Sequence, residues 1–376
     1  MHDSQLDISP DLVRTLIDRQ FPRWRSLPVS HVAAAGTENA IFRIGDRYAA
    51  RFPLKAGDAD AVRRSLEAEA AAAAELAGRT RFPTPEPIAL GEPSAGYPLP
   101  WSVQTWLPGT VATDADPGES DAFAHDLAEF IAGVRSIPTR GRTFTGRGRG
   151  GDLPDHDRWL ETCFARSTGL LDVPRLRGMW AALRTLPRGA AADVMNHADL
   201  MPGNVLVTGD RRLAGVLDVG DLQAADPALD LVGAWHLLES GPRQALRASL
   251  RPDDLEWARG KAWAFQQSMG LVWYYADSNP VMSAIGRRTL DRLLADERRL
   301  RWVARGGRLG SDSFPASVKS VSVKPRLAGR QPSTAGVPRV RTWPVPGWGG
   351  QAWTRIDRVL SSAGDHECRF LLFSRP

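Results

Sequence analysis

A chain of 376 residues, of which 43% are hydrophobic, is long enough to bury a sizeable core in two or three structural units. No apolar run approaches the roughly 20 residues that cross a bilayer, and the polar N-terminus is unlike a secretory signal peptide, so we expect neither a membrane protein nor a secreted one. The two cysteines, Cys163 and Cys368, are too few for a disulfide framework or a multi-cysteine metal site and favour a cytoplasmic protein.

The formal charge of +5 conceals two unlike parts. Residues 301–376 contain 13 Lys and Arg against 4 Asp and Glu, a net charge of +9, whereas the rest contains 35 basic and 39 acidic residues, a net charge of −4. The mildly acidic body argues against a nucleic-acid enzyme and is compatible with a cationic small-molecule substrate. The basic tail, 306–376, is rich in Gly, Pro, Ser and Arg, and we expect most of it to be disordered.

The first part of the chain alternates strand and helix signals. Ser9 and Pro10 predict the start of a helix, because Ser caps a helix and Pro fits its first turn. The stretch 59–77, rich in Ala and Glu without Gly or Pro, predicts a second helix that Gly78 closes. Strand patterns occur over 29–33, 40–44, 47–52 and 101–107. Strands with one inserted helix predict a small α+β lobe over 1–107.

Beyond Pro108-Gly109, which we expect to form a hinge, the pattern becomes mainly helical. Helices are expected over 121–134, 159–186, 226–238, 255–275 and 283–300. An Arg/Gly-rich loop covers 141–151, and two short apolar stretches, 205–207 and 214–217, predict a β-hairpin. The fold expected is therefore α+β and bilobal, with a second lobe over 108–305 and the tail after it.

The most informative stretch is His197-Ala198-Asp199-Leu200-Met201-Pro202-Gly203-Asn204, which Asp218-Val219-Gly220 follows after the predicted hairpin. This spacing of two carboxylates and an amide is what phosphoryl transfer requires. Asp199 is the expected catalytic base for an attacking hydroxyl. Asn204 and Asp218 are the expected ligands of Mg²⁺, which prefers hard oxygen ligands and takes few of them from the protein.

Further residues are candidates for the nucleotide site. Arg51 ends the third strand, where its guanidinium can reach the α- and β-phosphates if an acid on the next helix holds it; Glu69 is the expected acid, with Glu67 as the alternative. The loop at Gly36 and Thr37 lies where backbone N–H groups can cover the phosphates, although an ordinary hairpin turn explains it equally well.

Other polar residues near the main motif favour structural roles. His197 is expected to brace the loop that carries Asp199 rather than to act as an acid or base. Asp226, before a proline, is expected to cap a helix. Asp221, Asp230 and Glu239 can add negative charge to an acceptor cleft, and structural or solvated roles are equally open for them.

Together these stretches resemble the aminoglycoside phosphotransferase-like small-molecule kinases, a branch of the protein-kinase-like fold, from about residue 10 to 300. The resemblance rests on residues 35–46, 51–53, 97–102, 197–204, 217–221 and 226–231, of which the 197–204 loop is the most specific. It implies a bilobal fold, with a small antiparallel-sheet lobe, a larger helical lobe that binds the acceptor, and the nucleotide between them.

Residue by residue, the resemblance places the base at Asp199 and the Mg²⁺ ligands at Asn204 and Asp218. It puts the phosphate-binding cation at Arg51, with Glu69 as its partner. The stretch 104–107, with Gln104 and Trp106, falls at the interlobe hinge, whose backbone meets the nucleotide base. The chain departs from the family at three positions, none of which removes a catalytic atom. The cation is Arg51 instead of the common Lys, Ala198 replaces a common Gly, and Val219 replaces the aromatic residue of protein kinases.

The expected activity is transfer of the γ-phosphate of ATP or GTP, with Mg²⁺, to a hydroxyl of a small polar molecule. An aminoglycoside-type antibiotic is the first acceptor to test, which would imply antibiotic resistance. A metabolic kinase of a sugar, amino alcohol or macrolide stays open. A catalytically silent nucleotide-binding module and a nucleic-acid-associated protein acting through the basic tail are the alternatives from other classes.

Overall fold

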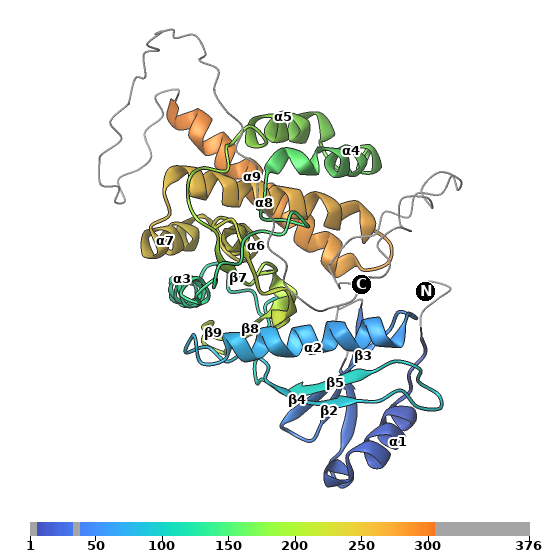
Figure 1. Ribbon diagram of the computed structural model, residues 1–376. Helices are drawn as coiled ribbons and strands as arrows, with labels where there is room; N and C mark the ends of the chain where they lie inside the picture. The colour runs from blue at the N-terminus through green and yellow to red at the C-terminus, as the bar shows by residue number, and fades with distance from the viewer. Residues whose placement is uncertain (1–5, 33–37, 305–376) are drawn as a thin grey trace, which may run out of the picture. The chain divides into compact units, whose positions relative to one another are not determined.

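The computed structural model describes residues 6–32 and 38–304, with side chains as far as 296. The described chain forms a smaller lobe built on one sheet and a larger lobe made mainly of helices (Figure 1). This is the fold class that the sequence predicts. Gly36, Thr37 and the tail 306–376 lie outside the described residues, so the predictions made for them stay predictions.

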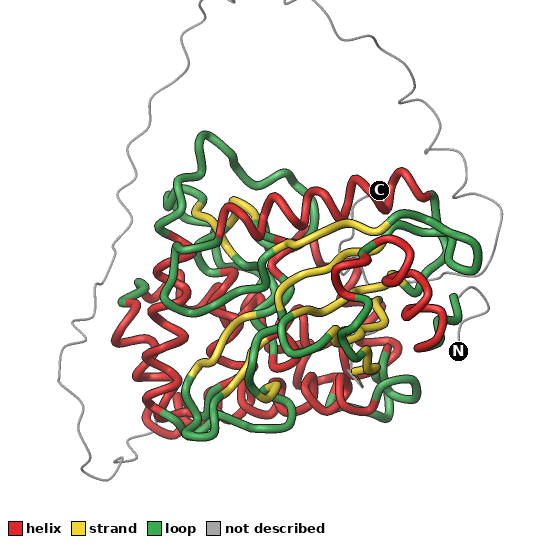
Figure 2. Tube along the Cα trace, turned by 90° about the horizontal axis from the view of Figure 1, so that it is seen from below, coloured by secondary structure: helices red, strands yellow, loops and turns green. Residues whose placement is uncertain are grey.

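The smaller lobe contains one antiparallel sheet with the strand order β1-β2-β3-β5-β4 (Figure 2). Its strands are β1 (Val29–Val32), β2 (Asn39–Ile44), β3 (Tyr48–Pro53), β4 (Pro87–Gly91) and β5 (Trp101–Thr105). The ring of Phe52 stacks on Trp101 with the ring centroids 4.6 Å apart, and both side chains are fully buried. The sequence did not predict β4. It begins at Pro87 on the edge of the sheet, where a residue without an N–H group is tolerated.

Two helices complete this lobe. Helix α1 (Pro10–Gln20) begins as predicted, with the Ser9 hydroxyl accepting the N–H of Leu12. Helix α2 (Ala59–Leu76) runs along the boundary between the two lobes (Figure 1). Glu69 lies just past the middle of α2, and the last turns of the helix contribute Ala73 and Leu76 to the core of the larger lobe. Helix α2 therefore contacts both lobes.

The larger lobe is organised around α8, whose residues from Ala262 to Val272 are all buried. Its helices are α3 (Asp121–Arg135), α4 (Asp157–Arg166), α5 (Val173–Leu183), α6 (Val232–Leu237), α7 (Ser240–Leu250), α8 (Asp254–Tyr274) and α9 (Pro280–Ala304). Short strands form two small sheets, one of β6 (Thr110–Val111), β8 (Val205–Val207) and β9 (Leu213–Val216), the other of β7 (Val194–Asn196) and β10 (Gln223–Ala225). Strand β7 directly precedes the 197–204 loop in sequence, and β8 directly follows it.

The helix predicted from Asp226 to Leu238 is wrong at its start. A 3₁₀ turn over Leu229–Leu231 comes first, and α6 begins only at Val232. Asp226 caps this turn, since its Oδ1 accepts the N–H of Ala228 at 3.0 Å, and its other oxygen accepts from buried Arg259 at 2.7 Å. The sequence also failed to predict α7, β7 and β10.

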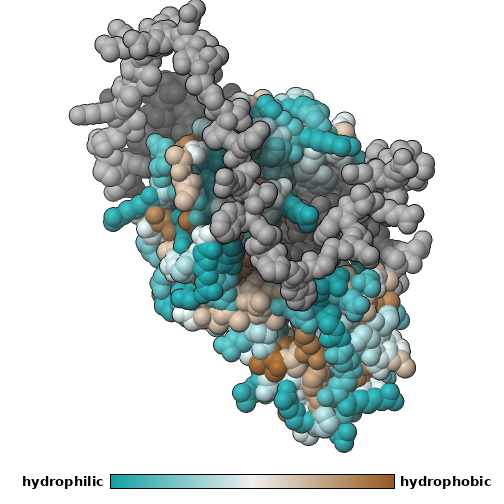
Figure 3. All heavy atoms as spheres, viewed as in Figure 1, coloured by the Kyte–Doolittle hydropathy of each residue, from teal (hydrophilic) through white to brown (hydrophobic). Residues whose placement is uncertain are grey.

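Most of the face seen in Figure 3 is covered by hydrophilic residues, with hydrophobic ones over the sheet of the smaller lobe. Among the described residues, the large hydrophobic side chains that are exposed are Ile88, Leu170 and Val281. No helix within the described ranges is long and apolar enough to cross a membrane.

The ion pair between Asp226 and Arg259 predicts a large effect on stability. Both side chains are nearly inaccessible, at 2% and 1% exposed. We expect Arg259→Leu to lower the free energy of unfolding by about 3–5 kcal/mol, because it leaves a buried carboxylate without its main cation. Arg247→Leu is the control: its partner Asp254 is 98% exposed, and the loss should stay below about 1 kcal/mol. Urea unfolding measures both variants, and equal losses would contradict the prediction.

Candidate functional site

The backbone of the 197–204 loop is anchored by the buried carboxylate of Asp230. Its Oδ2 accepts the N–H of His197 and its Oδ1 accepts the N–H of Ala198, each at 2.8 Å. Asp230 is 0% exposed, so these hydrogen bonds are shielded from water. Of the roles left open by the sequence, Asp230 therefore has the structural one.

The ring of His197 braces the loop, as the sequence predicts. The N–H of Asp199 donates to Nδ1 of His197 at 3.3 Å, and Nε2 lies 2.9 Å from the carbonyl oxygen of Leu217. A ring that accepts at Nδ1 and donates at Nε2 is neutral. The ring thereby fixes the loop to the residue that precedes Asp218.

Ala198, which lies between His197 and Asp199, has a φ of +72°. This left-handed conformation is easier for glycine than for alanine, which accounts for the glycine that is common here in the family that the chain resembles.

Both oxygens of the Asp199 side chain accept hydrogen bonds, although the residue is only 3% exposed. Oδ2 accepts from Nδ2 of Asn204 at 2.8 Å. Oδ1 accepts from Nε2 of Gln267 at 2.7 Å and from Arg149 at 3.2 Å. Arg149 also donates to the carbonyl of Ala198 at 2.9 Å. The carboxylate is thus held in one orientation by three donors from separate parts of the chain.

Sequence reasoning missed Arg149 and Gln267. Arg149 was visible only as one arginine of an Arg/Gly-rich loop, and Gln267 only as part of a helix. Each is far from Asp199 along the chain, by 50 and 68 residues. The one indication in the sequence was a cation in a glycine-rich loop, and this did not show that Arg149 would contact Asp199.

The predicted hairpin brings Asn204 and Asp218 together. Val205 pairs with Val216, and the N–H of Leu217 donates to the carbonyl of Asn204 at 2.8 Å. Since Nδ2 of Asn204 donates to Asp199, its amide oxygen is the end left for a cation. The side chain of Asp218 is half exposed, at 50%.

These two oxygen donors suit Mg²⁺, which leaves most of its coordination sphere to phosphate and water. Within the described ranges, no three His, Cys, Asp or Glu side chains lie close enough to form a metal site alone.

Arg51, Glu69 and Asp218 form a small ionic network between β3, α2 and the turn after β9. Arg51 pairs with Glu69 through one guanidinium nitrogen, and its other nitrogen lies 3.5 Å from Asp218. Glu69, the first choice for the partner acid, is therefore the residue that pairs with Arg51. Glu67, the alternative, is exposed on α2. A Cβ on Gly220 would lie 2.9 Å from Cγ of Glu69, which shows how closely α2 packs on this turn.

The predicted hinge stretch 104–107 begins at the end of β5, which lies between β3 and β4 in the sheet. The N–H of Thr105 donates to the backbone carbonyl of Glu86 at 2.9 Å, and the N–H of Trp106 donates to the backbone carbonyl of Arg47 at 2.8 Å. Neither N–H group is therefore free for a nucleotide base. The ring of Trp106 lies under the guanidinium of Arg43 at 4.9 Å. Gln104 lines a cavity of about 250 Å³ together with Glu69 and Asp218. The structure thus brings three of the predicted site residues to one cavity.

The two acids predicted for the acceptor cleft differ. Burial, followed by the charges of Asp199 and Asp218, raises the pKa of Asp221 to about 7, which places this carboxyl in the same electrostatic environment as the 197–204 loop. Glu239 instead pairs with Arg288 at 3.0 Å and Arg292 at 2.7 Å. Although burial opposes it, these hydrogen bonds hold the pKa of Glu239 below its usual value. Its charge is neutralised there.

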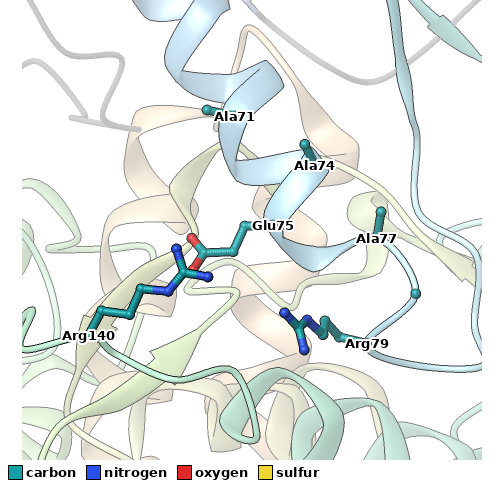
Figure 4. A pocket seen from close by; sticks show the side chains of 7 residues that line it. Ala71, Ala74, Glu75, Ala77, Arg79 and Arg140 are labelled. Atoms are coloured by element: carbon teal, nitrogen blue, oxygen red, sulfur yellow. The ribbon is translucent and has the colours of Figure 1, made fainter.

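A second hollow of about 520 Å³ lies at the C-terminal end of α2. Figure 4 shows Glu75, Arg79 and Arg140 around it, with the side chain of Arg140 reaching toward Glu75. Glu75 is paired with Arg142. None of the predicted site residues lines this hollow.

Comparisons with solved structures agree with the fold. The GDP complex of aminoglycoside 2'-phosphotransferase-IIIa is similar with a TM-score of 0.58 and 20% identity, over 77% of this chain and 100% of that one. A GDP and kanamycin complex of an APH(2") enzyme has a TM-score of 0.58 and 21% identity, over 76% and 98%. Macrolide 2'-phosphotransferase type I has a TM-score of 0.50 and 16% identity, over 75% and 98%. At such identities the likeness shows the fold alone.

No curated protein matches the sequence. The model of the phosphotransferase enzyme family matches residues 31–263, which is more than half of the chain and includes Arg51, Glu69 and the 197–204 loop. The chain therefore belongs to the phosphotransferase enzyme family.

Proposed function

We propose that the protein transfers the γ-phosphate of ATP or GTP to a hydroxyl of a small polar molecule. The observation that carries this proposal is the convergence of Asp199, Asn204 and Asp218, from one loop and the end of a hairpin, next to Arg51. A buried carboxylate, two donors for a divalent ion and a phosphate-binding cation are the parts that phosphoryl transfer needs. The nucleotide lies, in this proposal, between lobes 1–107 and 108–305.

Asp199 acts on the acceptor. Its carboxylate orients the attacking hydroxyl and takes its proton as the oxygen bonds to the γ-phosphorus and the bond to the β-phosphate oxygen breaks. The hydrogen bonds from Asn204 and Gln267 hold the carboxylate in place beforehand, so little reorientation is needed at the moment of transfer.

The residues of the smaller lobe bind the nucleotide. Arg51 contacts the α- and β-phosphates, and Glu69 holds its guanidinium in position. A phosphate-binding role for Gly36 and Thr37 stays a prediction from the sequence, because both lie outside the described residues. In the hinge, base contacts fall to the carbonyl groups and to Leu107, because the N–H groups of residues 105 and 106 are already used.

The amide oxygen of Asn204 and the carboxylate of Asp218 are the groups that would hold Mg²⁺ beside the phosphates. When bound, the ion neutralises charge on the transferring phosphoryl group. Burial and, after it, the charges of Asp199 and Asp218 raise the pKa of Asp221, and this local negative charge is a reason why a divalent cation would fit here.

Two classes of acceptor are candidates for this site. An aminoglycoside, as bound by one of the similar structures, would imply antibiotic resistance. A macrolide, sugar or amino alcohol is the second candidate. The cation of Arg149 beside Asp199 and the neutralised Glu239 favour an acceptor with few positive charges.

Nucleotide turnover on a panel of acceptors tests the proposal. The panel contains kanamycin, gentamicin, a macrolide, simple sugars and ethanolamine, each with Mg·ATP and Mg·GTP. We expect phosphorylation of at least one of them. Nucleotide binding without turnover on any acceptor would favour a catalytically silent binding module instead.

Asp199→Ala should lower kcat by about 10²- to 10⁴-fold, because it removes the base, and should leave nucleotide affinity within about threefold. Asp210→Ala, in an exposed turn, is the control. Steady-state kinetics and calorimetric nucleotide titration measure the two effects. The assignment of the base is wrong if Asp199→Ala keeps most of its turnover.

Asp218→Ala should weaken binding of the Mg-nucleotide by at least about tenfold, because it removes a charged ligand of the ion. Titration in EDTA provides the control, since the metal-free nucleotide should bind the variant at least as well as the wild-type protein. Equal Mg-nucleotide affinities for the two proteins would contradict the metal assignment.

A further inference from the structure

Three buried side chains connect the last helices of the larger lobe to Asp199. Nε2 of Gln267, on α8, donates to Oδ1 of Asp199 at 2.7 Å. Nε2 of His236, on α6, lies 3.1 Å from Oε1 of Gln267. Nδ1 of His236 lies 2.9 Å from Oγ1 of Thr289, on α9. Gln267, His236 and Thr289 are 6%, 3% and 0% exposed, so water has little access to this chain of hydrogen bonds.

The direction of each hydrogen bond follows from the chemistry of its partners. An ionised carboxylate only accepts, so the amide nitrogen of Gln267 faces Asp199 and the amide oxygen faces His236. Nε2 of His236 must then carry a proton, because two acceptors do not bond. A neutral ring with Nε2–H accepts at Nδ1, and the hydroxyl of Thr289 is the donor there.

Burial supports the neutral form of this ring. It lowers the pKa of His236 to about 3, against a hydrogen bond to Gln267 that acts in the opposite direction. The hydroxyl of Thr289 also lies 3.0 Å from the carbonyl of Ile285, so its single proton is shared between the helix and the ring.

The neighbouring residue shows that this contact is specific to one glutamine. Gln266 is as buried as Gln267, at 7% against 6%, but its amide meets His156 at 3.2 Å and not Asp199. The amide oxygen of Gln266 has no hydrogen-bond partner among the described residues, whereas both ends of the Gln267 amide are paired. The two side chains therefore serve separate partners, although they adjoin on α8.

We propose that Gln267 is a positioning residue for Asp199, and that neutral His236 and the hydroxyl of Thr289 fix which end of its amide faces the carboxylate. This inference rests on the proposed role of Asp199 as the base. With Asn204 on Oδ2 and Gln267 on Oδ1, the plane of the carboxylate is set from both sides. The effect of Gln267 is on the transfer step and not on nucleotide binding, because its amide contacts Asp199 and His236, whereas the proposed phosphate and metal contacts fall to Arg51, Asn204 and Asp218.

Gln267→Met tests the inference, because methionine has a similar length and no donor. We expect kcat to fall by about 10- to 100-fold, as for other residues that orient a functional side chain, and KM for the nucleotide to stay within about twofold. The assay uses the acceptor of the panel above that gives turnover. Gln266→Met is the matched control and should keep wild-type kcat.

Substitutions at Thr289, the last residue in this series of hydrogen bonds, distinguish a positioning role from a packing role. Thr289→Val keeps the shape and removes the hydroxyl, whereas Thr289→Ser keeps the hydroxyl and removes a methyl group. We expect the Val variant to lose about three- to tenfold in kcat and the Ser variant to retain most of it. A purely structural role predicts the reverse order, because only Ser opens a cavity in the core.

The tautomer of His236 gives a readout that needs no acceptor. In ¹⁵N-histidine NMR at pH 7, its signal, assigned by its loss in His236→Gln, should be that of a neutral ring protonated on Nε2. A ring protonated on Nδ1 would overturn the inference. So would wild-type kcat in Gln267→Met alongside an inactive Asp199→Ala, and this result would leave the proposed function intact. An active Asp199→Ala would instead overturn the proposed function and the inference with it.

Discussion

The site depends on one buried carboxylate that takes no part in the chemistry. Asp230 binds the backbone N–H groups of His197 and Ala198 with both of its oxygens. Without these acceptors two buried donors would be unpaired, and the left-handed conformation of Ala198 would lose its support. The position of Asp199 follows from this anchor, and through the ring of His197 so does the distance to the strand end that carries Asp218.

The charges around this anchor are arranged in two groups. Arg51, Glu69 and Asp218 lie where the smaller lobe meets the larger one, and Arg149 with Asp199 lies within the larger lobe. In the first group the carboxylates outnumber the cation, which suits an added divalent ion. In the second a single arginine faces the carboxylate that is proposed as the base.

The sequence predicted those parts of the site that lie close together along the chain or carry a chemical signature. The loop 197–204 and the hairpin after it are contiguous, so their spacing alone indicated that Asn204 and Asp218 would meet. The pairing of Arg51 with Glu69 followed from the requirement that a cation at the strand end has an acid on the next helix. The larger helices were predicted because their apolar periodicity persists over many residues.

What the sequence could not show is the set of contacts that only tertiary packing creates. Gln267 is a buried polar residue on the mostly buried helix α8, and no local pattern in the sequence distinguishes it from Gln266. Glu239 was a candidate to add charge to the cleft, with a structural role equally open, and two arginines on α9 neutralise it.

Asp226 illustrates the same limit, since its burial against Arg259 was not visible in the residues beside it. The side chains that hold Gln267 against Asp199 lie on α6 and α9, whereas Arg51, Glu69 and Asp218 contact one another across β3, α2 and the turn after β9. A substitution at Gln267 therefore changes the support of Asp199 without removing a member of that ionic network.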